Sequence, residues 1–307
     1  MRIGLIDVDG HNFPNLPLMK LSAWHKAHGD HVEWYAPLLS GRMDIVYMAK
    51  VFSFTPDYGF PVNADQIVRG GTGYNIVLQD NREIWTGGVE TILPEEAEHT
   101  YPDYELYGIT DTAYGFMSRG CPCGCFFCHV KSKEGRKTHK VADLSEFWRG
   151  QKEIEICDPN LLACPEAEDL LQQLVDSKAM VDINQGIDAR MLTDRNCKII
   201  KKIRMKYYHF AWDNPGDEEK IIPKLSMFCE IVKPYKKNVI VYCLTNYDST
   251  LDEDFYRIYK LREIGVQPYV MIYDKKHADP IYPKIQRWCN SPQIFWSTPK
   301  FEDYERR

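Results

Sequence analysis

Four cysteines lie close together in one short segment of the sequence, at Cys121, Cys123, Cys125 and Cys128. The spacing Cys121-x3-Cys125-x2-Cys128 places three thiolates on one tight loop. Thiolates are soft ligands that suit zinc or iron–sulfur clusters. Three protein ligands on a four-iron cluster leave one iron open, and an open iron can bind a small molecule and pass it an electron. The spacing therefore predicts a metal site with room for a ligand.

The absence of a second pair of cysteine or histidine ligands elsewhere in the sequence bears on the identity of the metal. A structural zinc site usually has four ligands, arranged as two pairs that are set apart in the sequence. The other cysteines lie singly, at positions 157, 164, 197, 229, 243 and 289. Zinc would need Cys123 as its fourth ligand. Four cysteines this close together in the sequence leave little room for tetrahedral coordination. We favour an iron–sulfur cluster and interpret Cys123 as a bystander, with zinc or redox and structural thiols as the alternatives.

The cysteine loop resembles the signature of the radical S-adenosylmethionine (SAM) superfamily, Cys-x3-Cys-x-aromatic-Cys. Cys121, Cys125, Phe127 and Cys128 match it position by position. The resemblance implies a 4Fe-4S cluster on the three cysteines, SAM on the open iron, and Phe127 beside the adenine. It also implies reductive cleavage of SAM to a 5′-deoxyadenosyl radical that abstracts hydrogen from a substrate, and an electron donor such as flavodoxin or ferredoxin. The substrate itself is not indicated by the sequence.

The composition is that of an ordinary soluble globular protein. The chain has 307 residues, which is enough for two domains, with 44% hydrophobic and 27% charged residues and a net charge of −6. The negative charge argues against a protein that coats nucleic acid. No apolar run is long enough to span a membrane, and an acid at Asp7 ends the first apolar run early, which favours a strand over a signal peptide. We expect a cytoplasmic protein with free thiols.

The first 80 residues have the pattern of a parallel sheet. Apolar segments at 2–8, 31–36, 44–49 and 66–68 predict strands, and helical spacing across 18–27 predicts a helix. Strands that alternate with helices form parallel sheets, with ligands at the carboxyl ends of the strands.

Residues 1–80 resemble the cobalamin-binding type of Rossmann-like domain that precedes the radical domain in one branch of the superfamily. Gly70 and Gly71 match a glycine pair at the end of a strand. Asp9 and His11 match two positions of the pattern Asp-x-His-x-x-Gly, but Pro14 stands where the glycine belongs. The resemblance implies the fold, and bound cobalamin is possible but not favoured.

Two segments of low periodicity flank the cysteine loop. Residues 81–107 contain prolines, glycines and acids, and are interpreted as a linker or lid. The basic run 131–140 is interpreted as a solvated loop, and 143–149 as the start of a helix.

Residues 108–280 are predicted to form the radical domain. Six short apolar segments, each followed by polar residues, predict strands at 112–117, 153–157, 180–183, 207–211, 238–244 and 267–272. The superfamily uses a partial (β/α)6 TIM-type barrel, in which these polar ends would line one cavity facing the cluster. Residues 281–307 form an aromatic C-terminal tail. The fold class expected is therefore α/β, with a Rossmann-like parallel sheet followed by a partial barrel.

The polar strand ends supply candidate ligands for SAM. The Gly-Gly-Glu stretch that usually holds the SAM amino group is absent, and Asp158 stands where an acceptor for that ammonium would be. Arg190 can pair with the SAM carboxylate in a bidentate way. Further candidates for ribose or substrate contacts are Asn184, Gln185, Asp213 and Asn246. For each of them a helix N-cap or turn is the alternative role.

We expect a radical SAM enzyme with a single cluster, acting on an unknown substrate. One alternative is a cobalamin-dependent radical SAM methyltransferase. An alternative of another class is a zinc- or cluster-stabilised module that binds nucleic acid or protein, which the basic runs 131–140 and 201–206 would support. The second run is more simply interpreted as the exposed face of a helix.

Overall fold

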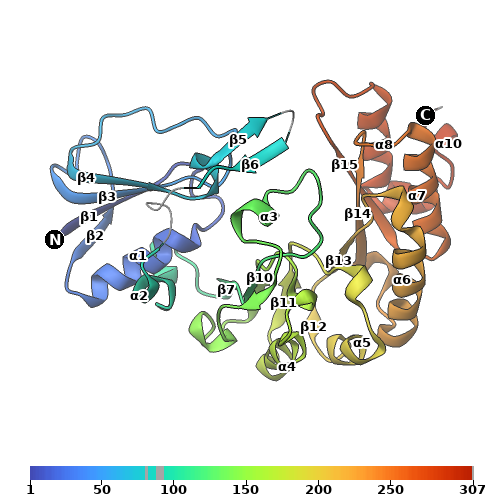
Figure 1. Ribbon diagram of the computed structural model, residues 1–307, viewed down its shortest axis with the longest axis horizontal. Coiled ribbons are helices and arrows are strands. Elements are labelled where there is room, and N and C mark those ends of the chain that lie inside the picture. The colour runs from blue at the N-terminus through green and yellow to red at the C-terminus, as the bar shows by residue number, and fades with distance from the viewer. Residues whose placement is uncertain (80–81, 88–92, 306–307) are drawn as a thin grey trace. The chain divides into compact units, whose positions relative to one another are not determined.

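The chain divides into two compact units, Met1–Lys152 and Glu153–Arg307. The computed structural model describes residues 1–79, 82–87 and 93–305 (Figure 1). Both units are mixed α/β with parallel sheets, so the predicted α/β class is confirmed. The predicted limits 1–80, 81–107, 108–280 and 281–307 remain predictions, and residues 81 and 88–92 of the predicted linker lie outside the described residues.

The first unit contains a parallel sheet with the strand order β2-β1-β3-β4. Its strands are β1 (Arg2–Asp7), β2 (His31–Trp34), β3 (Met43–Ala49) and β4 (Ala64–Gly70). Helix α1 (Leu16–Ala27) begins at Asn15, whose side chain accepts a hydrogen bond from the amide of Leu18 at 3.3 Å. Ile3 and Leu5 of β1 pack with Leu18 in the core. The four predicted strands and the predicted helix are therefore present.

The rest of the first unit is built from short elements. They are β5 (Ile76–Gln79), β6 (Arg82–Trp85), α2 (Glu95–Glu98), β7 (Thr112–Gly115), β8 (Ser118–Arg119), α3 (Val130–Lys133) and β9 (His139–Lys140), with 3-10 turns at Thr72–Tyr74, Tyr104–Tyr107 and Leu144–Glu146. Strands β5 and β6 form an antiparallel hairpin, and β8 pairs antiparallel with β9.

Two predictions for this region are wrong. The basic run 131–140 is not one solvated loop, because it contains most of α3 and the strand β9. The helix predicted for 143–149 is a single 3-10 turn. Asp143 and Glu146 form a reciprocal capping box around that turn, and Phe147 leaves the helical conformation directly after it. A capping box stabilises the start of a helix, so the helix ends here because the backbone at Phe147 has a φ of −134° and Gly150 follows with a φ of +99°.

The second unit alternates strands and helices along the chain. The strands are β10 (Glu153–Ile156), β11 (Met180–Ile183), β12 (Arg204–Met205), β13 (Tyr208–Ala211), β14 (Val239–Thr245) and β15 (Gln267–Ile272). The helices are α4 (Ala167–Ser177), α5 (Asp194–Ile200), α6 (Glu218–Val232), α7 (Leu251–Glu263), α8 (Ile281–Cys289), α9 (Pro292–Ser297) and α10 (Phe301–Glu305).

All strand pairs recorded in the second unit are parallel. Strand β11 pairs with β10 and β12, and β14 pairs with β13 and β15. Strand β12 was not predicted, and the interpretation of 201–206 as a helix face is wrong, because α5 ends at Ile200 and a turn leads into β12.

Alternate residues of these strands face the helices. Phe210 of β13 packs against Phe228 of α6 with ring centroids 4.9 Å apart, and Val270 of β15 packs in a cluster with Trp288 of α8. Helices α7 and α8 run beside β14 and β15 in Figure 1. The aromatic residues of the predicted tail complete this core, which leaves the other face of the strands free for polar side chains.

Candidate functional site

The cysteine loop is closed at its base by the hairpin of β8 and β9. Ser118 pairs with Lys140 and Arg119 with His139. The amide of Cys121 donates to the carbonyl of Gly135 at 3.2 Å. The Thr138 hydroxyl donates to the carbonyl of Gly120 at 3.1 Å. The segment that follows the cysteines therefore returns to fix the start of the loop.

Two glycines allow the backbone to fold this tightly. Gly120 has a φ of +86°, and a Cβ atom there would lie 2.4 Å from the carbonyl oxygen of Lys137. Gly124 has a φ of +62°, and its Cβ would lie 2.9 Å from Nη2 of Arg136. L-residues with side chains disfavour such φ values, and here they would also meet neighbouring atoms.

The four cysteines of the loop are half-buried. The amide of Cys128 donates to the carbonyl of Cys125 at 3.2 Å, which forms a turn between the second and third residues of the motif. Burial raises the pKa of the Cys128 thiol, and the charge of nearby Cys121 raises it further. Phe127 is half-buried, whereas its neighbour Phe126 is 52% exposed.

The loop offers a donor set without a closed coordination shell. Within the described chain, no three His, Cys, Asp or Glu side chains converge closely enough to hold a metal ion. The chemistry of the donor set nevertheless fits a cluster with three thiolate ligands, because the thiols of Cys121, Cys125 and Cys128 share one short loop with fixed ends. Thiols bind metals in their deprotonated form. Metal binding to these cysteines would therefore release protons and fix the positions of the three side chains.

Basic residues near the loop are held in defined positions. Nη1 of Arg119 lies 2.8 Å from Oε1 of Glu134, and Glu134 also accepts a hydrogen bond from the amide of Gly120 at 3.1 Å. Nζ of Lys133 donates to Oγ1 of Thr72 at 2.9 Å, and burial lowers the pKa of Lys133. The charge of Lys131 lowers the pKa of the Cys128 thiol, but the effect of burial is larger.

The segment after the cysteines is supported by Thr72, Glu83 and Trp85, which were not predicted. His129 Nδ1 lies 2.9 Å from Oε2 of Glu83, and the amide of Trp85 donates to the hydroxyl of Ser132 at 3.3 Å. These partners are 46 and 47 residues apart in the chain, so no local spacing reveals the contacts.

The residues predicted from the cobalamin pattern have structural partners. Asp9 accepts hydrogen bonds from the amide of Val51 and the hydroxyl of Thr55, each at 2.5 Å. His11 stacks on Trp34 with ring centroids 4.2 Å apart. The glycine pair has a steric reason, because a Cβ on Gly71 would lie 2.3 Å from the carbonyl oxygen of Lys50.

In the second unit, the candidates on β10 and β11 lie at the carboxyl ends of these strands. Asp158 follows β10 and is fully buried. The amide of Asn184 donates to the carbonyl of Ile156 at 3.2 Å, which places Asn184 beside the end of β10. Gln185 is exposed and donates to Oδ1 of Asn184 at 3.2 Å. Asp158 and Asn184 therefore both lie at the end of one strand pair.

Arg190 is engaged by carboxylates of its own unit. Its Nε and Nη2 donate to the two oxygens of Asp188 at 2.8 and 3.1 Å, and its Nη1 lies 3.5 Å from Asp217. Asp188 also accepts a hydrogen bond from Asn160 at 3.1 Å. A substrate carboxylate that used the same edge of the guanidinium would have to replace Asp188.

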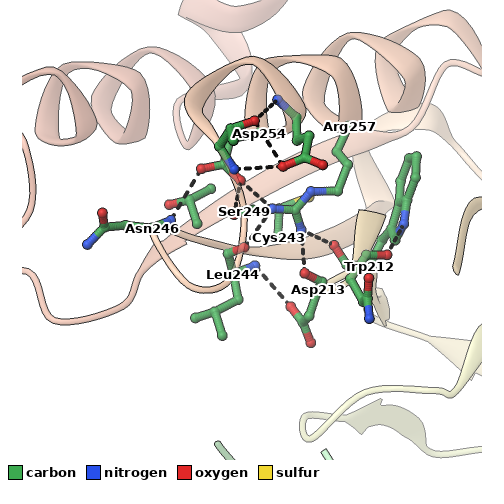
Figure 2. A network of polar contacts seen from close by, with 12 residues as sticks. Trp212, Asp213, Cys243, Leu244, Asn246, Ser249, Asp254 and Arg257 are labelled. Atoms are coloured by element: carbon green, nitrogen blue, oxygen red, sulfur yellow. Dashed lines mark hydrogen bonds and ion pairs between the residues drawn. The ribbon is translucent and has the colours of Figure 1, made fainter. Parts of the chain in front are cut away.

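Asp213 and Asn246 belong to a buried network around Arg257 of α7 (Figure 2). Arg257 donates to the backbone carbonyls of Trp212, Asp213 and Leu244 at 2.6, 2.9 and 2.8 Å. Arg257 and its ion-pair partner Asp254 are both fully buried. The guanidinium therefore ties together the ends of β13 and β14.

Each of the two candidates has its own contact in this network. Oδ1 of Asp213 accepts a hydrogen bond from the amide of Leu244 at 2.9 Å, while burial raises the pKa of the Asp213 carboxyl. Asn246 has a φ of +60°, and its amide donates to Asp254 at 3.2 Å. Both residues shape the loops at the strand ends.

A row of polar side chains that was not predicted lies on the strands themselves. They are Glu155, Asp182, His209 and Tyr242. The signal was present as strict alternation in β10, where Glu153 and Glu155 alternate with the buried Ile154 and Ile156.

Comparison with known proteins adds no relative to this description. No known family model matches the sequence, and no curated protein matches it either. In the described part of the chain, no helix is long and apolar enough to cross a membrane.

Proposed function

We propose that the protein is a radical SAM enzyme with one 4Fe-4S cluster. The observation that carries the proposal is the spacing of Cys121, Cys125 and Cys128, together with the preceding aromatic Phe127. The loop that holds them supports it, because its ends are fixed by hydrogen bonds and two glycines have backbone angles that side chains disfavour.

The cluster, when bound, would supply the electron that cleaves SAM and so starts chemistry on a substrate. The chain's own residues would hold and orient the components. The three cysteines would ligate the cluster, and Phe127 would flank the adenine. Proposed contacts for SAM or the substrate, all in the second unit, are Asp158, Asn184, Gln185, Arg190, Asp213 and Asn246.

We also propose the finer folds that the resemblance implies. The parallel order β2-β1-β3-β4 supports a Rossmann-like domain in the first unit. The parallel pairs of β10 with β11, and of β14 with β13 and β15, support a partial TIM-type barrel. An electron donor such as flavodoxin or ferredoxin would be the redox partner.

The test is anaerobic reconstitution with iron and sulfide, followed by reduction in the presence of SAM. We expect about four irons per chain, since three cysteine ligands suit a four-iron cluster, and formation of 5′-deoxyadenosine. Cys121→Ser, Cys125→Ser and Cys128→Ser should each lose most of the iron and all of the SAM cleavage.

Cys123→Ser is the matched control, because it changes a thiol of the same loop outside the proposed ligand set. It should keep both iron and SAM cleavage. Stable zinc with no iron uptake, or loss of the metal from Cys123→Ser as well, would contradict the proposal and favour a site with four thiolate ligands.

A further inference from the structure

One face of the second unit's strands carries a row of polar side chains. Glu155 of β10 lies directly beside Asp182 of β11 in the parallel register. The residues on either side of them in sequence, Ile154, Ile156 and Val181, are fully buried. Because side chains alternate between the two faces of a strand, the apolar residues face the helices and the carboxylates occupy the opposite face.

His209 of β13 connects this row to β14. Its Nε2 lies 3.1 Å from Oδ1 of Asp182, and its Nδ1 lies 3.0 Å from the hydroxyl of Tyr242. The His209 and Tyr242 rings are parallel to within 3°. Asp182 and His209 are 9% and 8% exposed. Both ring nitrogens of the histidine are thus occupied by side chains from neighbouring strands.

Asp182 has unused hydrogen-bonding capacity. The contact of its Oδ1 with His209 has the distance of an ion pair but not the geometry of a hydrogen bond. Among the described residues, no donor makes a hydrogen bond to this oxygen. A buried carboxylate oxygen without a donor is costly, and a ligand with N–H groups would satisfy it.

The row carries an excess of negative charge. Glu153, Glu155 and Asp182 lie on it with one lysine, Lys206, whose Nζ is 3.4 Å from Glu153. Burial, and then the charge of Asp182, raise the pKa of Glu155 to about 7, against smaller opposing effects of Lys206 and a hydrogen bond from Asn184. A cation beside Glu155 would relieve this repulsion.

Exposed aromatic rings lie beside Tyr242 and His209 of this row. Tyr269 of β15 lies beside Tyr242 in register, with ring centroids 5.5 Å apart, and is 39% exposed. Tyr207 is 38% exposed, and its ring centroid lies 5.9 Å from that of His209. Tyrosine faces attract cations, and a flat guanidinium can stack on a ring while it donates to carboxylates.

We propose that Glu155, Asp182, His209 and Tyr242 form a binding site for a guanidinium group of a ligand or substrate. The two carboxylates accept its N–H groups, and the tyrosine rings lie against its flat face. Asp182 also orients His209, which is a positioning role. The site is independent of the cysteine loop and is expected whether or not the chain binds a cluster.

The probe for this site is methylguanidinium, with methylurea as its neutral near-isostere. We would follow the imidazole nitrogen resonances of His209 by NMR in the full chain, and assign them with His209→Gln. Methylguanidinium should shift these resonances saturably, and methylurea should not. Because the ionised form of Glu155 binds the cation, affinity should rise by up to about tenfold from pH 6 to pH 8 for a carboxyl that titrates near neutral pH.

Three variants separate the site from a general charge effect. Glu155→Gln, which keeps the shape of the side chain, should weaken binding at least tenfold and remove its pH dependence, and Tyr269→Leu should weaken it several-fold. Glu168→Gln is the control, because Glu168 pairs with Arg195 on the helices α4 and α5 and should leave binding unchanged.

The proposal is overturned if methylurea shifts His209 as strongly as methylguanidinium, if neither shifts it, or if Glu155→Gln binds as well as the unchanged protein. Displacement of methylguanidinium by SAM, without reductant, would also overturn it, because the row would then belong to the SAM site. None of these outcomes depends on iron loading, so the proposal and the proposed enzyme activity fail separately.

Discussion

At the scale of single residues, Glu155 is unusual because its surroundings disfavour the ionised form of its carboxyl group. Burial and the neighbouring Asp182 raise its pKa to about 7 from an ordinary value of 4.5. The folded protein therefore holds a proton on Glu155 that the unfolded chain releases between these two pH values. Folding stability should fall as the pH rises through this range.

This effect predicts that Glu155→Gln stabilises the protein at pH 8. The gain should be about 1–2 kcal/mol, after the effect of the raised pKa is reduced for a half-buried group that solvent partly screens. The gain should disappear well below pH 4.5, where both states bind the proton. Urea unfolding at a series of pH values measures it.

The control for this comparison is Glu168→Gln, which should change stability by less than about 1 kcal/mol at any pH because it breaks only a surface ion pair. Parallel stability curves for Glu155→Gln and the unchanged protein from pH 5 to pH 8 would show that Glu155 titrates normally.

At the scale of elements, the hairpin of β8 and β9 decides whether the cysteine loop can form. Gly120 and Gly135 have nearly the same φ, +86° and +87°, but different surroundings. A Cβ on Gly120 would lie 2.4 Å from a backbone oxygen, whereas a Cβ on Gly135 would meet no atom within 4 Å. Alanine substitutions at the two glycines therefore distinguish the energetic cost of the positive φ angle from the cost of the steric clash.

Gly135→Ala should cost about 1–2 kcal/mol, the usual penalty for a side chain at such an angle. Gly120→Ala should cost clearly more and should reduce iron uptake after reconstitution, because the loop can no longer close against the segment that follows it. Urea unfolding and iron content per chain measure both effects. Equal stability and equal iron content in the two variants would mean that the hairpin does not control the loop.

At the scale of the whole molecule, the net charge of the chain favours an enzyme over a module that binds nucleic acid. The net charge is −6, and the described parts of both basic runs lie on short strands, turns and the short helix α3. Several of these lysines and arginines already contact acidic side chains or backbone oxygens, such as Lys140 with Asp143 and Arg136 with the carbonyl of Pro122.

We expect no saturable binding of single- or double-stranded nucleic acid at about 0.15 M salt, because such binding needs several cations free to contact phosphates. Fluorescence anisotropy with labelled oligonucleotides measures this. A Kd that is low at this salt and rises steeply with added salt would instead favour the binding module.

The sequence by itself determined the elements whose apolar residues form a clear run. The strands β1, β3, β11, β14 and β15 were predicted because each is a short, mainly apolar segment followed by polar residues. The two-residue strands β8, β9 and β12 were missed, because two residues have no periodicity. The predicted helix at 143–149 was wrong, because the backbone leaves the helical conformation at Phe147 after a single 3-10 turn.

The thiol spacing is likewise a property of sequence, since its residues lie on one short loop and need no distant partner to be close. Only the tertiary structure decided which polar groups meet across strands. Asp182 and His209 become neighbours because β11 and β13 lie near each other in space. Arg257, on the helix that follows β14, reaches the end of β14 and also the end of β13, 45 residues earlier in the chain. The local sequence pattern determines which face of a strand a side chain occupies. Packing of the whole unit determines which other strand lies beside that strand.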